Sequence, residues 1–212
     1  MKKDLGLYLH VPFCVKKCDY CDFLSKEAAE EEKEAYVDAL IKEIKSYKKF
    51  AGNYKVSTVF VGGGTPSCLR AEQTKRIFDA LYEIFEFVKH PEITTEMNPG
   101  TVDREKLEVY KACGINRLSI GMQSVKDENL KVLGRIHNQL SREAGFTNIN
   151  LDLMSSLPSQ TKEEWEEELQ KTVELNPEHI SAYQLIIEEG TPFYEKYDAH
   201  PELLPNEEES RA

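Results

Sequence analysis

Short apolar runs alternate along this chain with longer segments of helical periodicity. Runs of strand length occur at 5–13, 56–61, 93–97, 117–122, 148–153 and 179–187. Apolar residues recur three or four positions apart at 27–47, 77–88, 103–112, 127–133 and 161–175. Such alternation favours a parallel sheet whose strands are joined by right-handed crossovers. Six units predict an α/β fold of the partial (β/α)6, TIM-like barrel kind, with an open doubly wound sheet as the alternative.

A few residues define the helix ends and the end of the chain. Gly114 follows the third helical segment and is predicted to end it. Trp165, Leu169 and Val173 are predicted to face inward from the last helix. Residues 201–212 are acidic, contain prolines and lack periodicity, so a loop or tail is expected there.

Charge and hydropathy limit the partners of the 212-residue chain. The 38 acidic and 27 basic residues give a formal net charge of −11. Such a surface repels phosphate backbones, so no nucleic-acid partner is expected. No apolar run is long enough to span a bilayer, and the opening Met-Lys-Lys-Asp is unlike a secretory signal. We therefore expect a cytoplasmic protein with no membrane span.

Three of the five cysteines lie within eight residues, at Cys14, Cys18 and Cys21. An odd cysteine count without an export signal argues against a disulfide framework. Three thiolates from one loop suit an iron–sulfur cubane, which then keeps one iron open for a ligand. A zinc site with His10 as its fourth ligand and a set of unliganded thiols are the alternatives. The two isolated cysteines are predicted to be small core residues: Cys68 and Cys113.

The stretch HVPFCVKKCDYCDF resembles the cluster motif of radical S-adenosylmethionine (SAM) proteins, C-x3-C-x-aromatic-C. The wider stretch 8–23 resembles one subgroup, the oxygen-independent coproporphyrinogen III oxidases and the radical-SAM haem chaperones. Further matching segments are VGGGTPS, EMNPGT, RLSIGMQS, LGRIHN, DLMSSLPSQT and EEGTPFY. The resemblance implies a [4Fe–4S] cluster held by the three clustered cysteines, with SAM bound beside it. It also implies a radical-SAM core over residues 1–190 and the start of a C-terminal region over 191–212.

Polar and glycine residues follow the ends of the predicted strands, which is where a (β/α) barrel has its active site. The cysteine loop follows the first strand, and the glycines 62–64 follow the second, where they allow close backbone approach to a ligand. Glu96, Gln123 and Asp152 stand at or near the ends of the next three strands. The resemblance assigns these residues to SAM: Tyr8, Tyr20, Gly63, Gly64, Thr65, Glu96, Gln123, Arg135 and Asp152.

Individual roles within that set differ. Arg135 is expected to pair with the carboxylate of SAM in a bidentate fork, while carboxylate and amide groups hold its ammonium and ribose hydroxyls. Tyr20 either contacts adenine or packs within the loop. A structural role and a functional role both stay open for His10 and His137. Between Arg135 and Asp152 the chain is shorter than the family pattern by roughly two helical turns.

One position separates the haem chaperones from the oxidases. The oxidases have a fourth cysteine shortly after the third, and this chain has Phe23 there. The first strand also begins near Leu5, whereas the oxidases carry an N-terminal extension. We therefore expect a protein that binds haem and delivers it to acceptor proteins, with a flavodoxin-type electron donor as a partner. Oxidative decarboxylation of coproporphyrinogen III and RNA modification are the alternatives, and whether the chain is an enzyme stays open.

Overall fold

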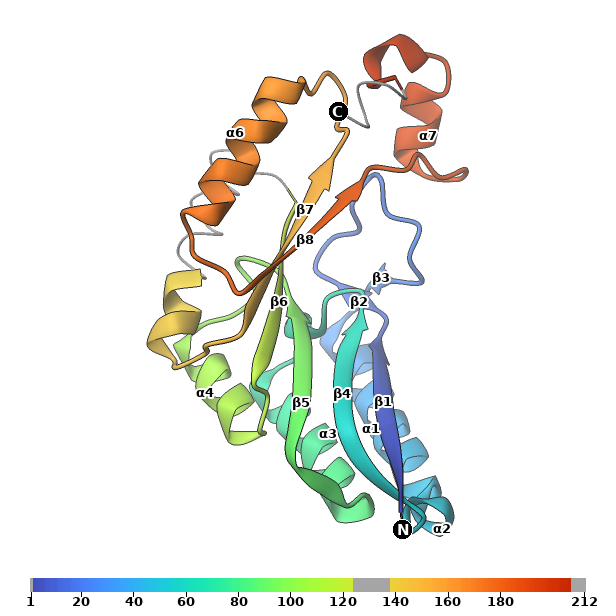
Figure 1. Cartoon of the computed structure of the whole chain (residues 1–212). Helices are drawn as coiled ribbons and strands as arrows, with labels where there is room; N and C mark the ends of the chain where they lie inside the picture. Colours follow the sequence, from blue (N-terminus) through green and yellow to red (C-terminus); the bar gives the residue numbers. More distant parts are fainter. Residues whose placement is uncertain (1, 124–137, 207–212) are drawn as a thin grey trace.

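The computed structural model describes residues 2–123 and 138–206, and its centre is a six-stranded parallel sheet (Figure 1). The strands, in spatial order, are β1 (Lys3–Val11), β4 (Tyr54–Gly63), β5 (Phe87–Met97), β6 (Arg117–Gln123), β7 (Ile149–Ser155) and β8 (His179–Gln184). The order of these six strands across the sheet is the same as their order along the chain, and it never reverses. A doubly wound sheet needs a reversal of strand order. That alternative is therefore wrong, and the fold is the predicted partial barrel.

The helices are α1 (Glu30–Ser46), α2 (Lys48–Ala51), α3 (Ala71–Ile84), α4 (Arg104–Ala112), α6 (Lys162–Val173) and α7 (Pro192–Tyr197), and residues 138–143 are also helical. Helix α1 packs against α3, and α3 packs against α4, behind the sheet in Figure 1. Local side chains fix where two helices begin. The Asp103 carboxylate accepts from the Lys106 N–H at 2.8 Å, and the Thr161 hydroxyl accepts from the Glu164 N–H at 3.2 Å.

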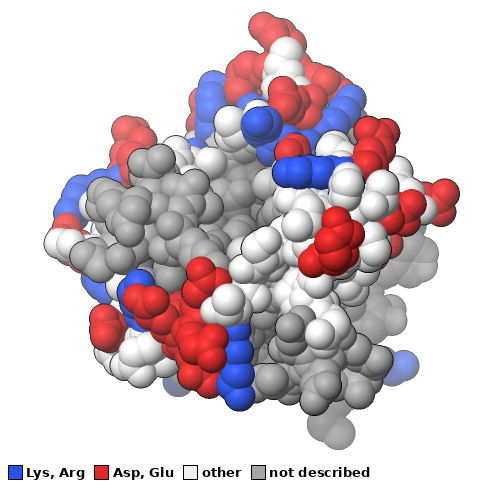
Figure 2. All heavy atoms as spheres, turned by 90° about the horizontal axis from the view of Figure 1, so that it is seen from above, with Lys and Arg blue, Asp and Glu red and all other residues white. Residues whose placement is uncertain are grey.

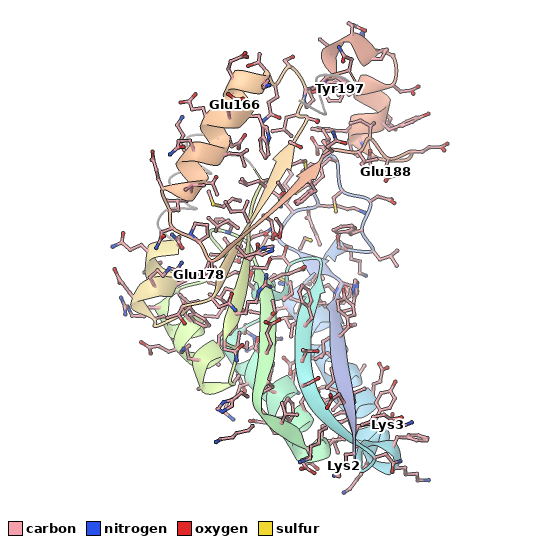
Figure 3. All side chains as sticks on the ribbon, in the orientation of Figure 1. Lys2, Lys3, Glu166, Glu178, Glu188 and Tyr197 are labelled. Carbon is pink, nitrogen blue, oxygen red and sulfur yellow. The ribbon has the colours of Figure 1, made fainter. Side chains whose placement is uncertain are left out.

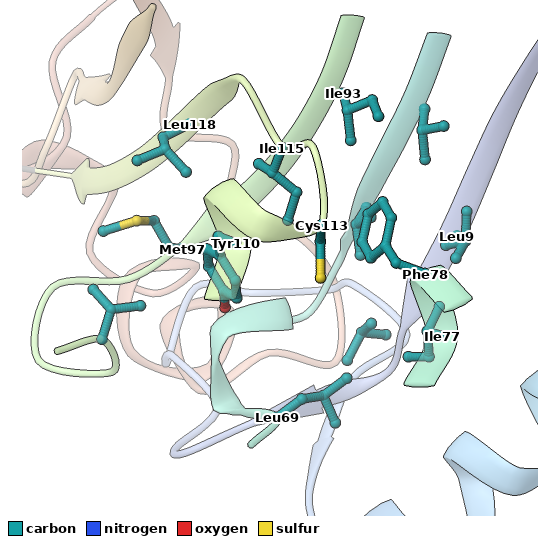
Figure 4. Packing of buried hydrophobic residues seen from close by; sticks show 14 of the residues in the cluster. Leu9, Leu69, Ile77, Phe78, Ile93, Met97, Tyr110, Cys113, Ile115 and Leu118 are labelled. Carbon is teal, nitrogen blue, oxygen red and sulfur yellow. The ribbon is translucent and has the colours of Figure 1, made fainter. Parts of the chain in front are cut away.

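Period-two alternation gives the sheet one apolar and one polar side. In β6, Leu118 and Ile120 are fully buried, and Ser119 between them lines a cavity on the other side. In β7, Leu151 is fully buried and its neighbour Asp152 lines the same cavity. The apolar side forms the core with the helices, shown in Figure 4 by Leu9, Leu69, Ile77, Phe78, Ile93, Met97, Tyr110, Cys113, Ile115 and Leu118. Burial of Cys113 confirms its prediction as a core residue, and Cys68 packs against the edge of the same core.

The structure confirms some of the predicted helix details and corrects others. Gly114 has a φ of +81° directly after α4, which confirms its role in ending that helix. Val88 lies in β5 and not in a helix, because α3 ends at Ile84 and the chain then pairs with β4. Val173 is 55% exposed at the end of α6, so its inward placement was wrong.

The hydropathy pattern did not predict two short features of the structure. A two-strand ladder joins β2 (Phe13–Cys14) to β3 (Lys26–Glu27), and helix α7 follows β8. The last strand ends at Gln184, three residues before the predicted end, and the described part of the tail holds a short 3-10 turn, Pro201–Leu203. None of the described helices has the length and apolar content needed to cross a membrane.

Candidate functional site

A cavity of about 570 Å³ occupies the polar side of the sheet and reaches the carboxyl ends of the strands. Its volume falls in the usual range for small-molecule sites. At this end of the molecule lie Glu188 and Tyr197, whereas Lys2 and Lys3 mark the opposite end (Figure 3). Most of the predicted site residues line the cavity: Cys14, Cys18, Cys21, Tyr20, Gly63, Gly64, Thr65, Glu96, Gln123 and Asp152. Arg135 and His137 lie outside the described residues.

The cysteine loop is closed at its base by the small ladder between β2 and β3. Cys14 pairs with Glu27 in that ladder, and the Lys26 N–H donates to the Pro12 carbonyl at 3.0 Å. Within the loop, the Cys21 N–H donates to the Cys18 carbonyl at 3.0 Å. The 11 residues from 15 to 25 thus form a loop whose two ends are held together. This geometry presents all three thiols to one cavity.

The arrangement of the three thiols bears on which metal group they could hold. Within the described ranges, no three His, Cys, Asp or Glu side chains are arranged to hold one metal ion. A cubane makes a different demand, because its thiolates bind separate irons at separate corners. His10 is also engaged elsewhere: its Nε2 lies 3.1 Å from the Leu24 carbonyl oxygen, and its Nδ1 lies 3.0 Å from the Tyr8 hydroxyl. These contacts favour a structural role for His10 over a zinc ligand.

Tyr8 lies beside the cavity and does not line it. Its ring stacks against Phe60 with centroids 6.2 Å apart, and its side chain is 61% exposed. Phe60 itself lines the cavity. Tyr8 pairs with Phe60 in the sheet register, so its side chain lies on the same face of the sheet as the cavity.

Tyr20 joins the cysteine loop to the segment after β8. Its ring meets the Phe193 ring edge-on at 6.2 Å, and the Phe193 N–H donates to the Asp19 carbonyl at 3.0 Å. Phe193 in turn packs edge-on against Tyr197 at 5.2 Å. Burial raises the pKa of the Tyr20 phenol, which stays neutral at physiological pH. Helix α7 therefore supports the cysteine loop, a contact that the sequence pattern did not reveal.

The glycine turn after β4 fits tightly under the cysteine loop. A Cβ on Gly64 would lie 2.6 Å from the Phe13 carbonyl oxygen, so only glycine allows this approach. Gly63 has a φ of +119°, a backbone conformation that favours glycine. The Gly64 and Thr65 N–H groups donate to the Val11 and Phe13 carbonyls at 2.8 and 2.7 Å. The glycines therefore position the cysteine loop, and the N–H groups of Gly64 and Thr65 are already used within the protein.

Glu96 ends β5 in a half-buried position. It accepts a hydrogen bond from the Gly63 N–H at 3.1 Å. Its pKa is raised from 4.5 to about 7, chiefly by burial and also by the nearby Asp152 carboxylate, while the Gly63 hydrogen bond acts in the opposite direction. A cationic ligand group in the cavity would favour the ionised carboxylate.

Asp152 is held by a polar network that crosses three strands. The Ser119 hydroxyl donates to Asp152 Oδ2 at 2.8 Å, and Asn150 Nδ2 donates to Asp152 Oδ1 at 2.7 Å. Asn150 Oδ1 accepts from the Ser181 hydroxyl at 3.0 Å and contacts His179 Nδ1. Asn150 is 2% exposed and uses both ends of its amide, so it fixes the carboxylate rigidly. The polar positions that alternate with leucine and isoleucine in β6 and β7 were the sequence signal for this network.

Gln123 closes the upper end of β6 in a left-handed conformation, with a φ of +62°. The Tyr183 hydroxyl donates to Gln123 Oε1 at 2.5 Å. Burial raises the pKa of Tyr183 to about 12, so its hydroxyl keeps the proton that it donates. The unusual backbone and this bond turn the Gln123 side chain toward β8, at the cavity wall.

Known proteins resemble this chain over nearly its whole length. Heme chaperone HemW of Escherichia coli (strain K12) is 40% identical over 213 residues, which is 96% of this chain and 55% of the relative. The protein of the same name from Bacillus subtilis (strain 168) is 36% identical over 95% of this chain and 56% of the relative. The chain thus spans about half the length of these relatives. A solved structure of coproporphyrinogen III oxidase (HemN) from E. coli has a TM-score of 0.85 and 31% identity, over 99% of this chain and 50% of its own. Residues 8–172 match the model of the Radical SAM superfamily, and the chain therefore belongs to that superfamily.

Proposed function

We propose that this chain is the core of a haem chaperone, which binds haem and delivers it to acceptor proteins. The observation that carries the proposal is the identity of about 40% to proteins named heme chaperone over nearly the whole chain. Identity to the coproporphyrinogen III oxidase of known structure is lower, at 31%. Phe23, at the position of the oxidases' fourth cysteine, supports the same choice.

The cavity mouth has the apolar surface that a tetrapyrrole requires. Phe23 is 69% exposed and Ile186 is 66% exposed, and both line the cavity. Figure 2, which looks down on this end, shows Asp, Glu, Lys and Arg along parts of the periphery and a patch of other residues beside them. Burial of a flat macrocycle against such side chains contributes about 25 cal/mol for each Å² removed from water.

Membership of the superfamily implies a [4Fe–4S] cluster and SAM. We assign the cluster to Cys14, Cys18 and Cys21, where bound it would supply an electron for reductive SAM chemistry. Glu96 and Asp152 would hold the ammonium and ribose hydroxyls of SAM. The other proposed SAM contacts, assigned through the family motif, are Tyr8, Tyr20, Gly63, Gly64, Thr65, Gln123 and Arg135.

The protein's own contribution is to orient SAM and to keep water away from the cluster. The carboxylate of Asp152 is fixed by Ser119 and Asn150, so a ligand hydroxyl meets an acceptor that needs no rearrangement. Glu96 would lose its proton when the ammonium arrives, because a nearby cation lowers a carboxyl pKa. Helix α7 covers one side of the cysteine loop through Phe193. A flavodoxin-type electron donor and a cytoplasmic location stay predictions.

The test is a side-by-side assay on the full-length protein, reconstituted anaerobically. We expect retention of haem after gel filtration, transfer of that haem to an apo-acceptor, and no conversion of coproporphyrinogen III with SAM and a reductant present. The Phe23→Cys variant is the matched control, and it is expected to remain inactive in decarboxylation. Steady decarboxylation by the wild-type protein, or failure to retain haem, would contradict the proposal and favour the oxidase.

A further inference from the structure

Arg117 differs from the other arginines that the structure describes. The others form ion pairs: Arg70 with Glu30 and Glu34, Arg76 with Glu34 and Asp38, Arg104 with Glu143, and Arg142 with Glu178. Arg117 has no ion pair and donates no side-chain hydrogen bond to any part of the chain that the structure describes. It is half-buried at the start of β6 and lines the cavity.

A half-buried guanidinium without an acceptor is costly, because its five N–H donors lose water and gain no partner. In a chain with a formal net charge of −11, carboxylates are abundant. Arg117 pairs with none of the carboxylates that the structure describes. Its guanidinium is therefore suited to bind a carboxylate of a ligand. The planar guanidinium forms two parallel hydrogen bonds with a carboxylate, which makes a carboxylate the favoured partner.

Strand register places Arg117 well below the proposed SAM contacts. Arg117 pairs with Thr94, two residues before Glu96, and it lies six residues before Gln123 on its own strand. At about 3.3 Å per residue, these separations are about 7 Å and about 20 Å along the strands. The acidic residues Glu96 and Asp152 thus lie closer to the carboxyl ends of the strands, and Arg117 lies toward the opposite end of the cavity.

We propose that Arg117 is the anchor for a ligand carboxylate at the lower end of the cavity. The inference rests on the proposed function, because two bound molecules carry suitable carboxylates. One is haem, through its propionates, and the other is SAM, whose methionine carboxylate would then pair with Arg117 and not with Arg135. The depth of Arg117 below Gln123 suits a group that extends away from the cluster end of the cavity.

The test compares Arg117→Gln with Arg104→Gln, which removes the same charge from an exposed surface ion pair. Calorimetry measures SAM affinity, and absorbance titration measures the affinity for haem and for haem dimethyl ester, which has no free propionate. We expect Arg117→Gln to weaken haem binding at least tenfold and to leave the ester unaffected, which assigns the propionate. An equal loss of SAM affinity with haem unchanged assigns the methionine carboxylate.

Unchanged affinity for both ligands would overturn the proposal, as would an equal loss for haem and its ester. Thermal unfolding of each variant checks the fold. Should Arg117→Gln not fold, Arg117→Lys keeps the charge without the planar fork, and a smaller loss than tenfold, confined to one acid ligand, is expected. A wild-type protein that retains no haem contradicts the proposed function alone, since the SAM arm still tests Arg117.

Discussion

Glu96 is expected to destabilise the fold whenever it is ionised and no ligand is bound. Its pKa of about 7 in the folded chain exceeds the ordinary value of 4.5, chiefly through burial. Each unit corresponds to about 1.4 kcal/mol. After allowance for the solvent that reaches a partly exposed carboxyl, the cost of ionisation is on the order of 2 to 3 kcal/mol.

The sign of the pH dependence follows from which state binds more protons. Below pH 4.5 both states are protonated and Glu96 contributes nothing. Between pH 4.5 and about 7 the unfolded chain releases its proton while the folded chain keeps it, so the free energy of unfolding falls as pH rises. Above a pH of about 7 the contribution of Glu96 to the free energy of unfolding falls no further. Glu96→Gln removes the charge and keeps an acceptor for the Gly63 N–H.

Urea unfolding of cluster-free, SAM-free protein at several pH values tests this reasoning. We expect Glu96→Gln to match the wild type at pH 4 and to exceed its free energy of unfolding by about 2 kcal/mol at pH 8. Glu92→Gln, at an exposed position of the same strand, is the matched control and is expected to show no such trend. A Glu96→Gln protein that is less stable than the wild type at pH 8 would refute the reasoning.

Three further variants probe the supports of the site. Asn150→Ala is expected to weaken SAM binding by about 1–3 kcal/mol, measured by calorimetry, because it releases the carboxylate that it holds; unchanged affinity would contradict the network's role. Phe193→Ala is expected to speed loss of iron to a chelator, since α7 then no longer supports the cysteine loop; an unchanged rate would argue against that support. Gly64→Ala is expected to lower stability by about 1–3 kcal/mol in urea unfolding, because its Cβ would overlap the Phe13 carbonyl. Gly52→Ala, where nothing lies within 4 Å, is its control, and equal effects of the two would contradict the packing argument.

Local patterns predicted the strands well, because strands depend on short-range signals, and most of the candidate site residues that they marked line one cavity. Apolar alternation located every strand of the sheet within a few residues, apart from the early start of β5, and placed Glu96 and Asp152 near strand ends. The choice between a barrel and a doubly wound sheet depends on which strands pair, and that is a long-range property. Helix α7 was missed for a related reason: six residues have little helical periodicity, and the helix contacts Tyr20, which is far away in the sequence.

Asn150 shows the limits of motif reasoning within the site. The family motif associates Tyr8 with SAM, and its ring stacks against Phe60 in the cavity wall, so that assignment stays a prediction. Alternation in β7 marks Asn150 as a polar residue, but its partners Ser119 and Ser181 are identified only when β6, β7 and β8 are aligned in register. Such cross-strand partners are fixed by tertiary structure and cannot be read from sequence spacing.

The content of iron and sulfide in anaerobically reconstituted protein tests the central claim most directly. The account predicts about four irons and four sulfides per chain. It predicts loss of both in Cys14→Ala, Cys18→Ala and Cys21→Ala, with full retention in Cys68→Ala. Stoichiometric zinc without iron–sulfur absorbance, or unchanged iron in the three loop variants, would contradict it.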